Sequence, residues 1–221
     1  SAFYEDEKMW GSSYPYGMVV YDVTDQFSAE GNTALLANTF PGGGNVSVRG
    51  MLLAVVYDDG TTAPHTVLMN EGFDLLYGGE AQGTTPEQAT AYAPFSGVET
   101  DDVLSATLIT VAPGAGPTKG DLLFNDQTWT RVWNYTGTTQ IGVDERDVTT
   151  FLIDGENLVG FQSSADYMEA AAAILVLEYP APPGTIFVTS DPTGAAVWLD
   201  GEDTGEVTPI TLEDVPAGDH V

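Results

Sequence analysis

Carboxylate side chains are the groups in this sequence best suited to chemistry, and several of them are adjacent. There are 33 Asp and Glu residues, with neighbouring pairs at Asp58-Asp59, Asp101-Asp102, Asp144-Glu145 and Glu202-Asp203. Glycoside hydrolysis needs two carboxyl groups held several ångströms apart across a cleft. With so many acids, adjacency identifies no such pair, and we interpret these residues as a solvated acidic surface.

Two acidic turns could instead bind calcium, which takes several oxygen ligands at close range. They are Asp58-Asp59-Gly60 and Asp200-Gly201-Glu202-Asp203, and neither matches an EF-hand loop. Asp58, Asp59, Asp200 and Asp203 are therefore weak calcium candidates, with ordinary acidic turns as the alternative. No other cofactor is expected.

The sequence offers little for nucleophilic or general-base catalysis. It contains no Cys, two His (His65 and His220) and no Gly-x-Ser-x-Gly elbow. The Gly- and Pro-rich run 113–120 lacks the Lys spacing of a phosphate-binding loop, so we interpret it as a turn. We predict that the protein is not an enzyme.

An aromatic row between residues 128 and 135 has two interpretations. Trp129, Arg131, Trp133 and Tyr135 alternate, and a regular strand would place them on one face. Such a row can form a platform for sugars, but it more often belongs to a sandwich core, with the Arg reaching out at an edge. We favour the core interpretation.

The charge balance indicates where the protein works. Five Lys and Arg stand against the 33 acids, for a net charge of −28, which excludes a conventional nucleic-acid binder. Such a chain suits brine or a cation-rich surface, and an ordinary acidic extracellular protein is the alternative.

Two sequons, at Asn45 and Asn134, are glycosylation candidates in a secreted protein. No apolar run reaches the ~18 residues of a membrane span.

The elements that must position these groups are strands. Residues 18–23, 46–57, 103–111, 128–135 and 174–179 are rich in β-branched and aromatic side chains, and Gly, Pro, Asn and Asp punctuate them. Single helical turns are expected within 86–93 and 149–152. The pattern predicts an all-β chain, a jelly-roll-like β-sandwich built from two related halves.

An internal repeat relates the two halves. An Asp-Val-Thr unit at 22–24 and an Asn at 32 recur 125 positions later, at 147–149 and 157, and an apolar segment follows each copy. We expect the repeated side chains to form a structural corner, because Asp and Thr side chains hydrogen-bond turn backbone. The repeated residues are Asp22, Thr24 and Asn32 in the first copy and Asp147, Thr149 and Asn157 in the second.

Residues 180–184, Pro-Ala-Pro-Pro-Gly, form a stiff linker that divides the chain. Before it lies a sandwich domain, 1–179, with the repeat copies at about 15–60 and 128–179. After it, 185–221 contains Ser190-Asp191-Pro192, Asp200-Gly201, Thr208-Pro209 and Pro216-Ala217-Gly218-Asp219. This pattern resembles the first part of a PEGA domain, a small β module of prokaryotic and archaeal surface proteins. The pattern breaks off at Val221, so we expect a partial module with open strand edges.

The larger part is similar to an uncharacterised β-domain family of methanogen surface proteins. The shared features are the Asp-Val-Thr units, the strand Ala54 to Asp58 and the run Asn70-Glu71-Gly72. The resemblance implies an archaeal envelope or secreted protein with no known activity. We predict a non-enzymatic structural protein of the cell surface that self-assembles or contacts other envelope proteins. The alternative is a carbohydrate-binding adhesion module.

Stability should rise with salt, because a net charge of −28 repels itself in the compact state and salt screens that repulsion. Melting temperatures measured from low to molar NaCl or KCl, without divalent ions, are expected to increase. A flat or falling trend would contradict this prediction.

Overall fold

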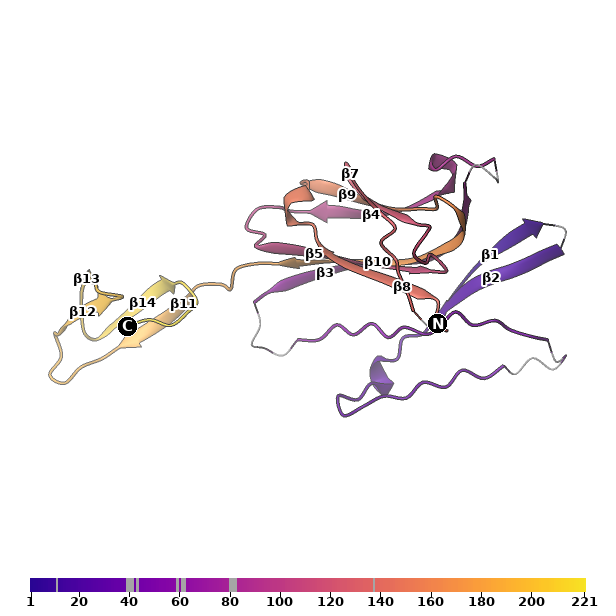
Figure 1. The fold of residues 1–221 in the computed structure, drawn as a ribbon. Coiled ribbons are helices and arrows are strands. Elements are labelled where there is room, and N and C mark those ends of the chain that lie inside the picture. The colour runs from indigo at the N-terminus through magenta and orange to yellow at the C-terminus, as the bar shows by residue number, and fades with distance from the viewer. Residues whose placement is uncertain are drawn as a thin grey trace.

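The computed structural model describes residues 1–10, 12–38, 42, 44–58, 60, 63–79, 83–136 and 138–221. Nearly all of the regular structure is β, as predicted. Two four-stranded antiparallel sheets form the main body, and Figure 1 shows them as two stacked layers.

The first sheet has the order β3-β10-β5-β8. Strand β10 (Asp166–Glu178) lies between β3 (His65–Gly78) and β5 (Ser105–Pro113), and β8 (Ile141–Asp147) pairs with the other edge of β5. The central position of β10 follows from its sequence, because the run Ala170 to Leu177 is apolar at every position.

The second sheet has the order β4-β9-β6-β7. Its central strands are β9 (Gly155–Gln162) and β6 (Asp121–Phe124), flanked by β4 (Thr90–Val98) and β7 (Gln127–Thr130). A 3-10 turn, Glu87–Ala89, precedes β4, and another, Thr149–Phe151, precedes β9. Both turns fall where the sequence predicted one.

The core lies between these two sheets. Large side chains from both layers are fully buried there and form one apolar cluster. Its largest members are Leu108 on β5, Leu122 and Phe124 on β6, Trp133, Val159 on β9, and Met168, Leu175 and Leu177 on β10.

Outside the sandwich, β1 (Ala2–Trp10) and β2 (Ser12–Val20) form a hairpin, and a 3-10 turn, Thr24–Gln26, follows it. From there the chain runs as extended loops outside the two sheets (Figure 1). The predicted strand at 46–57 is wrong, since the described residues 44–58 carry no strand assignment. These residues have the composition of a strand, but no described strand forms a ladder with them.

The predicted strand at 128–135 is also wrong beyond Thr130. Arg131 takes a left-handed backbone conformation (φ 57°), and its N–H donates to Asp121 Oδ1 at 3.1 Å. That turn ends β7 and breaks the alternation, so the residues that follow leave the sheet.

Trp133 then enters the core, where its ring stacks on Phe161 with 5.2 Å between centroids. Its indole N–H donates to Thr110 Oγ1 at 2.8 Å. Gly142 makes room for it, because a Cβ at that position would lie 2.5 Å from the Trp133 Cβ. A buried indole with a satisfied N–H is a favourable arrangement for so large a side chain.

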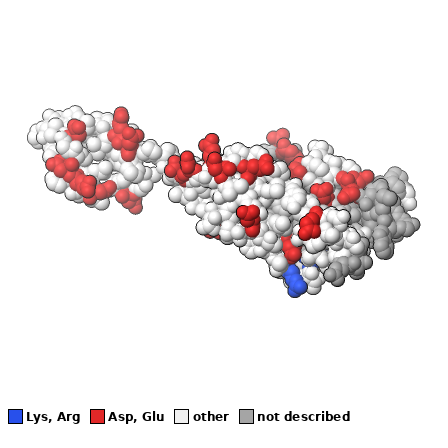
Figure 2. Space-filling model, turned by 90° about the horizontal axis from the view of Figure 1, so that it is seen from above, with Lys and Arg blue, Asp and Glu red and all other residues white. Residues whose placement is uncertain are grey.

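The C-terminal module consists of two two-stranded sheets, one of β11 (Gly184–Val188) with β14 (Ile210–Val215) and one of β12 (Ala196–Leu199) with β13 (Glu202–Val207). It stands apart from the sandwich in Figure 1, joined to it by residues 179–183. Figure 2 shows acidic side chains over both parts on the face in view.

Truncating Trp133 should remove a large part of the sandwich's stability. We expect Trp133→Ala to cost about 3–5 kcal/mol, because it leaves a cavity under Phe161 and deprives Thr110 of its donor. The measurement is urea unfolding followed by far-UV circular dichroism. Tyr92→Ala, at a side chain 56% exposed in the same sandwich, is the control and should cost less than ~1 kcal/mol. Equal losses in the two variants would contradict the core position of Trp133.

Candidate functional site

The aromatic row does not form one flat face. Trp133 is buried, whereas Trp129 and Tyr135 are half-buried and Arg131 is exposed. Trp129 packs edge-on against Phe151 at 5.6 Å, and the Arg146 guanidinium lies 4.4 Å from its ring centroid. Trp133, the central side chain of the sugar-platform interpretation, is therefore in the core and cannot stack on a sugar.

Both sequon asparagines are exposed, as glycosylation would require. Asn45 lies in the extended segment before Val46, and Asn134 follows Trp133 with its amide donating to the Arg131 carbonyl at 3.2 Å. Glycosylation at these residues stays a prediction.

Of the calcium candidates that the structure describes, Asp58 and Asp203 bond to their own turns, and Asp200 bonds to the end of the chain. Asp58 Oδ1 accepts from the Gly60 N–H at 2.7 Å, and Asp203 Oδ1 accepts from the Gly205 N–H at 2.9 Å. Asp200 contacts His220 Nδ1 and accepts from the Val221 N–H, both at 2.9 Å. Asp59 lies outside the described residues. Among the residues described, no group of three or more His, Asp or Glu side chains could hold a metal ion.

The two repeated corners have the same local geometry. The Asp carboxylate accepts the N–H of the Thr two residues on, at 3.0 Å for Asp22 and 2.8 Å for Asp147. The hydroxyl of that Thr, and after it the backbone N–H, hold the pKa of both carboxyls below the usual range. The intervening Val residues have nearly equal backbone angles, φ −119° and ψ 18° against φ −123° and ψ 13°.

The repeated asparagines also bond alike. Asn32 accepts from the Ser28 N–H at 2.9 Å and donates to the Ser28 carbonyl at 2.7 Å. Asn157 does the same with Ile153, at 3.0 Å and 2.7 Å. Local sequence is therefore sufficient to form this corner twice, 125 residues apart.

The corners differ in what surrounds them. In the second, Val148 and Asn157 are fully buried, Thr149 Oγ1 accepts from the Ala106 N–H, and the Asn125 amide donates to Asn157 Oδ1. In the first, residues 21–38 are all exposed. The second corner is integrated into a sandwich, and the first has the same form without that packing.

This difference predicts unequal effects of the same mutation. Asn157→Ala should cost about 1–3 kcal/mol, because part-buried groups of Asn125 and Ile153 lose their hydrogen bonds to the fully buried Asn157 amide. Asn32→Ala removes equivalent bonds in solvent and should change the unfolding free energy by no more than ~0.5 kcal/mol. Urea unfolding of both variants checks this, and similar costs would contradict it.

Glu169 is a buried carboxylate that sequence reasoning did not single out. It lies on β10 with 1% of its surface exposed, and its Oε1 is 3.3 Å from Arg49 Nη2. Arg49 also donates to Gln140 Oε1 and accepts from the Gln140 N–H through its carbonyl at 2.9 Å. Glu169 thus ties the extended segment around Arg49 to the sandwich. The only sequence signal was a lone acid at the start of an apolar run.

The second oxygen of that carboxylate, Oε2, is buried and has no hydrogen-bond partner among the described residues. Burial raises the pKa of the Glu169 carboxyl above its ordinary value of 4.5, against the opposing effect of Arg49. The folded chain therefore holds its proton at a higher pH than the unfolded chain does.

Glu169 should make the sandwich more stable as the pH falls. Between the raised folded pKa and the unfolded value near 4.5, the folded state binds more protons, so acidification through this window favours folding. Glu169→Gln lacks the titrating group. We expect the unfolding free energy of the unmodified chain, relative to Glu169→Gln, to increase as the pH is lowered from neutral. Urea unfolding at a series of pH values measures this, and a difference independent of pH would contradict it.

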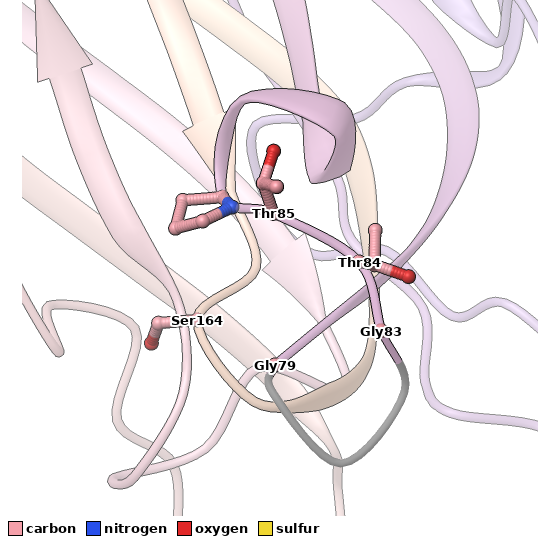
Figure 3. Close-up of a pocket in the computed structure, with 6 residues that line it drawn as sticks. Gly79, Gly83, Thr84, Thr85 and Ser164 are labelled. Carbon is pink, nitrogen blue, oxygen red and sulfur yellow. The ribbon is translucent and has the colours of Figure 1, made fainter.

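A surface pocket of about 410 Å³ lies at the end of β3, beside the turn before β4 (Figure 3). Its lining consists of small and hydroxyl side chains without a charged group among the described residues: Gly79, Gly83, Thr84, Thr85, Pro86 and Ser164. Among these described lining residues, none is an acid or base that could move a proton.

Comparison with known families identifies both parts of the chain. A family described as "Protein of unknown function (DUF3344)" matches residues 1–178, and the PEGA domain matches residues 183–221. A search of curated proteins found no match. No helix among the described residues is long and apolar enough to cross a membrane. The chain belongs to the DUF3344 family and carries a PEGA domain, a module often found in extracellular or surface proteins.

Proposed function

We propose that this DUF3344 protein is a non-enzymatic structural component of a cell surface, in an archaeal envelope, where it self-assembles. The observation that carries the proposal is the domain order, an all-β domain followed by a PEGA domain. Two β modules in series are suited to spacing and attachment outside a cell.

The linker supports a spacer role for the second module. Residues 180–183 contain three prolines, which restrict the backbone and supply no N–H for a sheet. No strand of the module pairs with a strand of the sandwich among the described residues. The module can therefore present its surface independently of the larger domain.

The acidic surface supports an envelope in a salty environment. The acids lie over both modules in Figure 2, whereas Arg49 and Arg146 are taken up in ion pairs with Glu169 and Asp144. A surface of this kind is soluble where cations are abundant, because they screen its repulsion. The archaeal assignment rests on this bias and on the similarity to methanogen surface proteins.

The non-enzymatic part of the proposal is supported by how the polar side chains are used. The Asp residues of both corners bond to turn backbone, and Glu169 bonds to a structural Arg. The pocket beside β4 offers hydroxyl groups without an acid or base among its described lining.

Surface exposure on the source cell tests the proposal. Intact cells are treated with a protease that cannot enter them, and released peptides are identified by mass spectrometry. We expect peptides from this chain in the released fraction and peptides of a cytoplasmic marker only after lysis. Release of this chain only together with the marker would contradict a surface location.

A further inference from the structure

The segment between the first corner and β3 exposes an unusual amount of apolar surface. We call residues 31–38 and 44–58 the arm. No strand is assigned within these described residues, although ten of their large apolar side chains are exposed, from 43% at Val55 to 90% at Leu35. Exposed apolar surface of this extent is typical of an interaction site.

The second repeat shows what segments of this kind do when they have neighbours. In the sequence, the repeat offset of 125 residues aligns 30–37 with β9. The apolar run 51–57 resembles the run 171–177 of β10. Strand β9 lies between β4 and β6, and β10 lies between β3 and β5. The arm therefore has the sequence of central strands, but no described strand pairs with it.

The arm is also nearly free of charge in a chain of net charge −28. Arg49 is the one charged side chain in 31–57, and it is paired with Glu169 at 3.3 Å. Depletion of charge is characteristic of the buried centre of protein interfaces. Two arms can approach one another without the repulsion that acts between the acidic faces of two copies.

We propose that a second copy of this chain covers the arm, with the 51–57 runs of two copies pairing as antiparallel strands across a twofold axis. A twofold axis brings identical segments together in opposite directions, which is the geometry of an antiparallel pair. Among the described residues, no strand of either sheet pairs with this run.

The available area is sufficient for such a dimer. At roughly 100 Å² each, the ten exposed side chains offer on the order of 1,000 Å² per copy, above the ~800 Å² per partner of a stable interface. Main-chain hydrogen bonds along the paired runs would fix the orientation of one copy relative to the other.

This inference deepens the self-assembly in the proposed function and rests on it. The two can fail separately, because a monomer can still lie on a cell surface.

Sedimentation velocity of the full chain in molar salt tests the proposal. We expect a dimer whose dissociation constant rises at least ~10-fold, ~1.4 kcal/mol, in Val56→Glu, which places like charges near the twofold axis. Leu104→Glu is the matched control, because it adds the same charge at a similarly exposed apolar side chain. Leu104 is 58% exposed against 68% for Val56, and Leu104 lies outside the arm. Its dissociation constant should be unchanged.

Three results would overturn the proposal. The first is a monomer at the highest soluble concentration, which would leave the arm to a different protein or to the chain's own fold. The second is an equal effect of Val56→Glu and Leu104→Glu, which would make the change one of general charge. The third is a dimer that Val56→Glu does not weaken, which would place the interface elsewhere.

Discussion

Strand β10 is apolar along most of its length, so it needs a hydrogen-bonded neighbour along each edge and cover on its faces. The sandwich meets this requirement. Strand β3 pairs with one edge and β5 with the other, while Leu175 and Leu177 fill the core. The same strand carries Glu169, whose buried carboxylate holds Arg49 and with it the arm. Edge pairing, core packing and the attachment of the first repeat thus all depend on β10.

The first repeat meets only the local part of that requirement. Its corner makes the same hydrogen bonds as the buried corner, because these bonds lie within a few residues of one another. No described strand pairs with its apolar run, since the neighbours of a strand come from distant parts of the sequence. A chain with satisfied turns and an uncovered apolar arm is suited to an assembly, which agrees with a structural role at a surface.

Sequence reasoning succeeded where structure is determined locally or by composition. It predicted the all-β architecture and the helical turns near 87 and 149, because turn chemistry and apolar periodicity are visible over short windows. The PEGA domain was found by resemblance to that family's motifs, and the family match confirms it. It failed at Arg131, whose left-handed backbone is supported by Asp121 ten residues away, and at 46–57, whose pairing depends on neighbours. Glu169 was missed because burial of a carboxylate follows from the placement of Arg49, 120 positions earlier.

The central claim is that the arm forms a hydrogen-bonded strand when a second copy pairs with it. Hydrogen–deuterium exchange of the full chain, at concentrations where sedimentation detects a dimer, tests this claim. The account predicts slow exchange in peptides from 44–58, comparable with that of β10 peptides, and faster exchange in the arm alone for Val56→Glu. Rapid, unprotected exchange of 44–58 in the dimer, with β10 still protected, would contradict it.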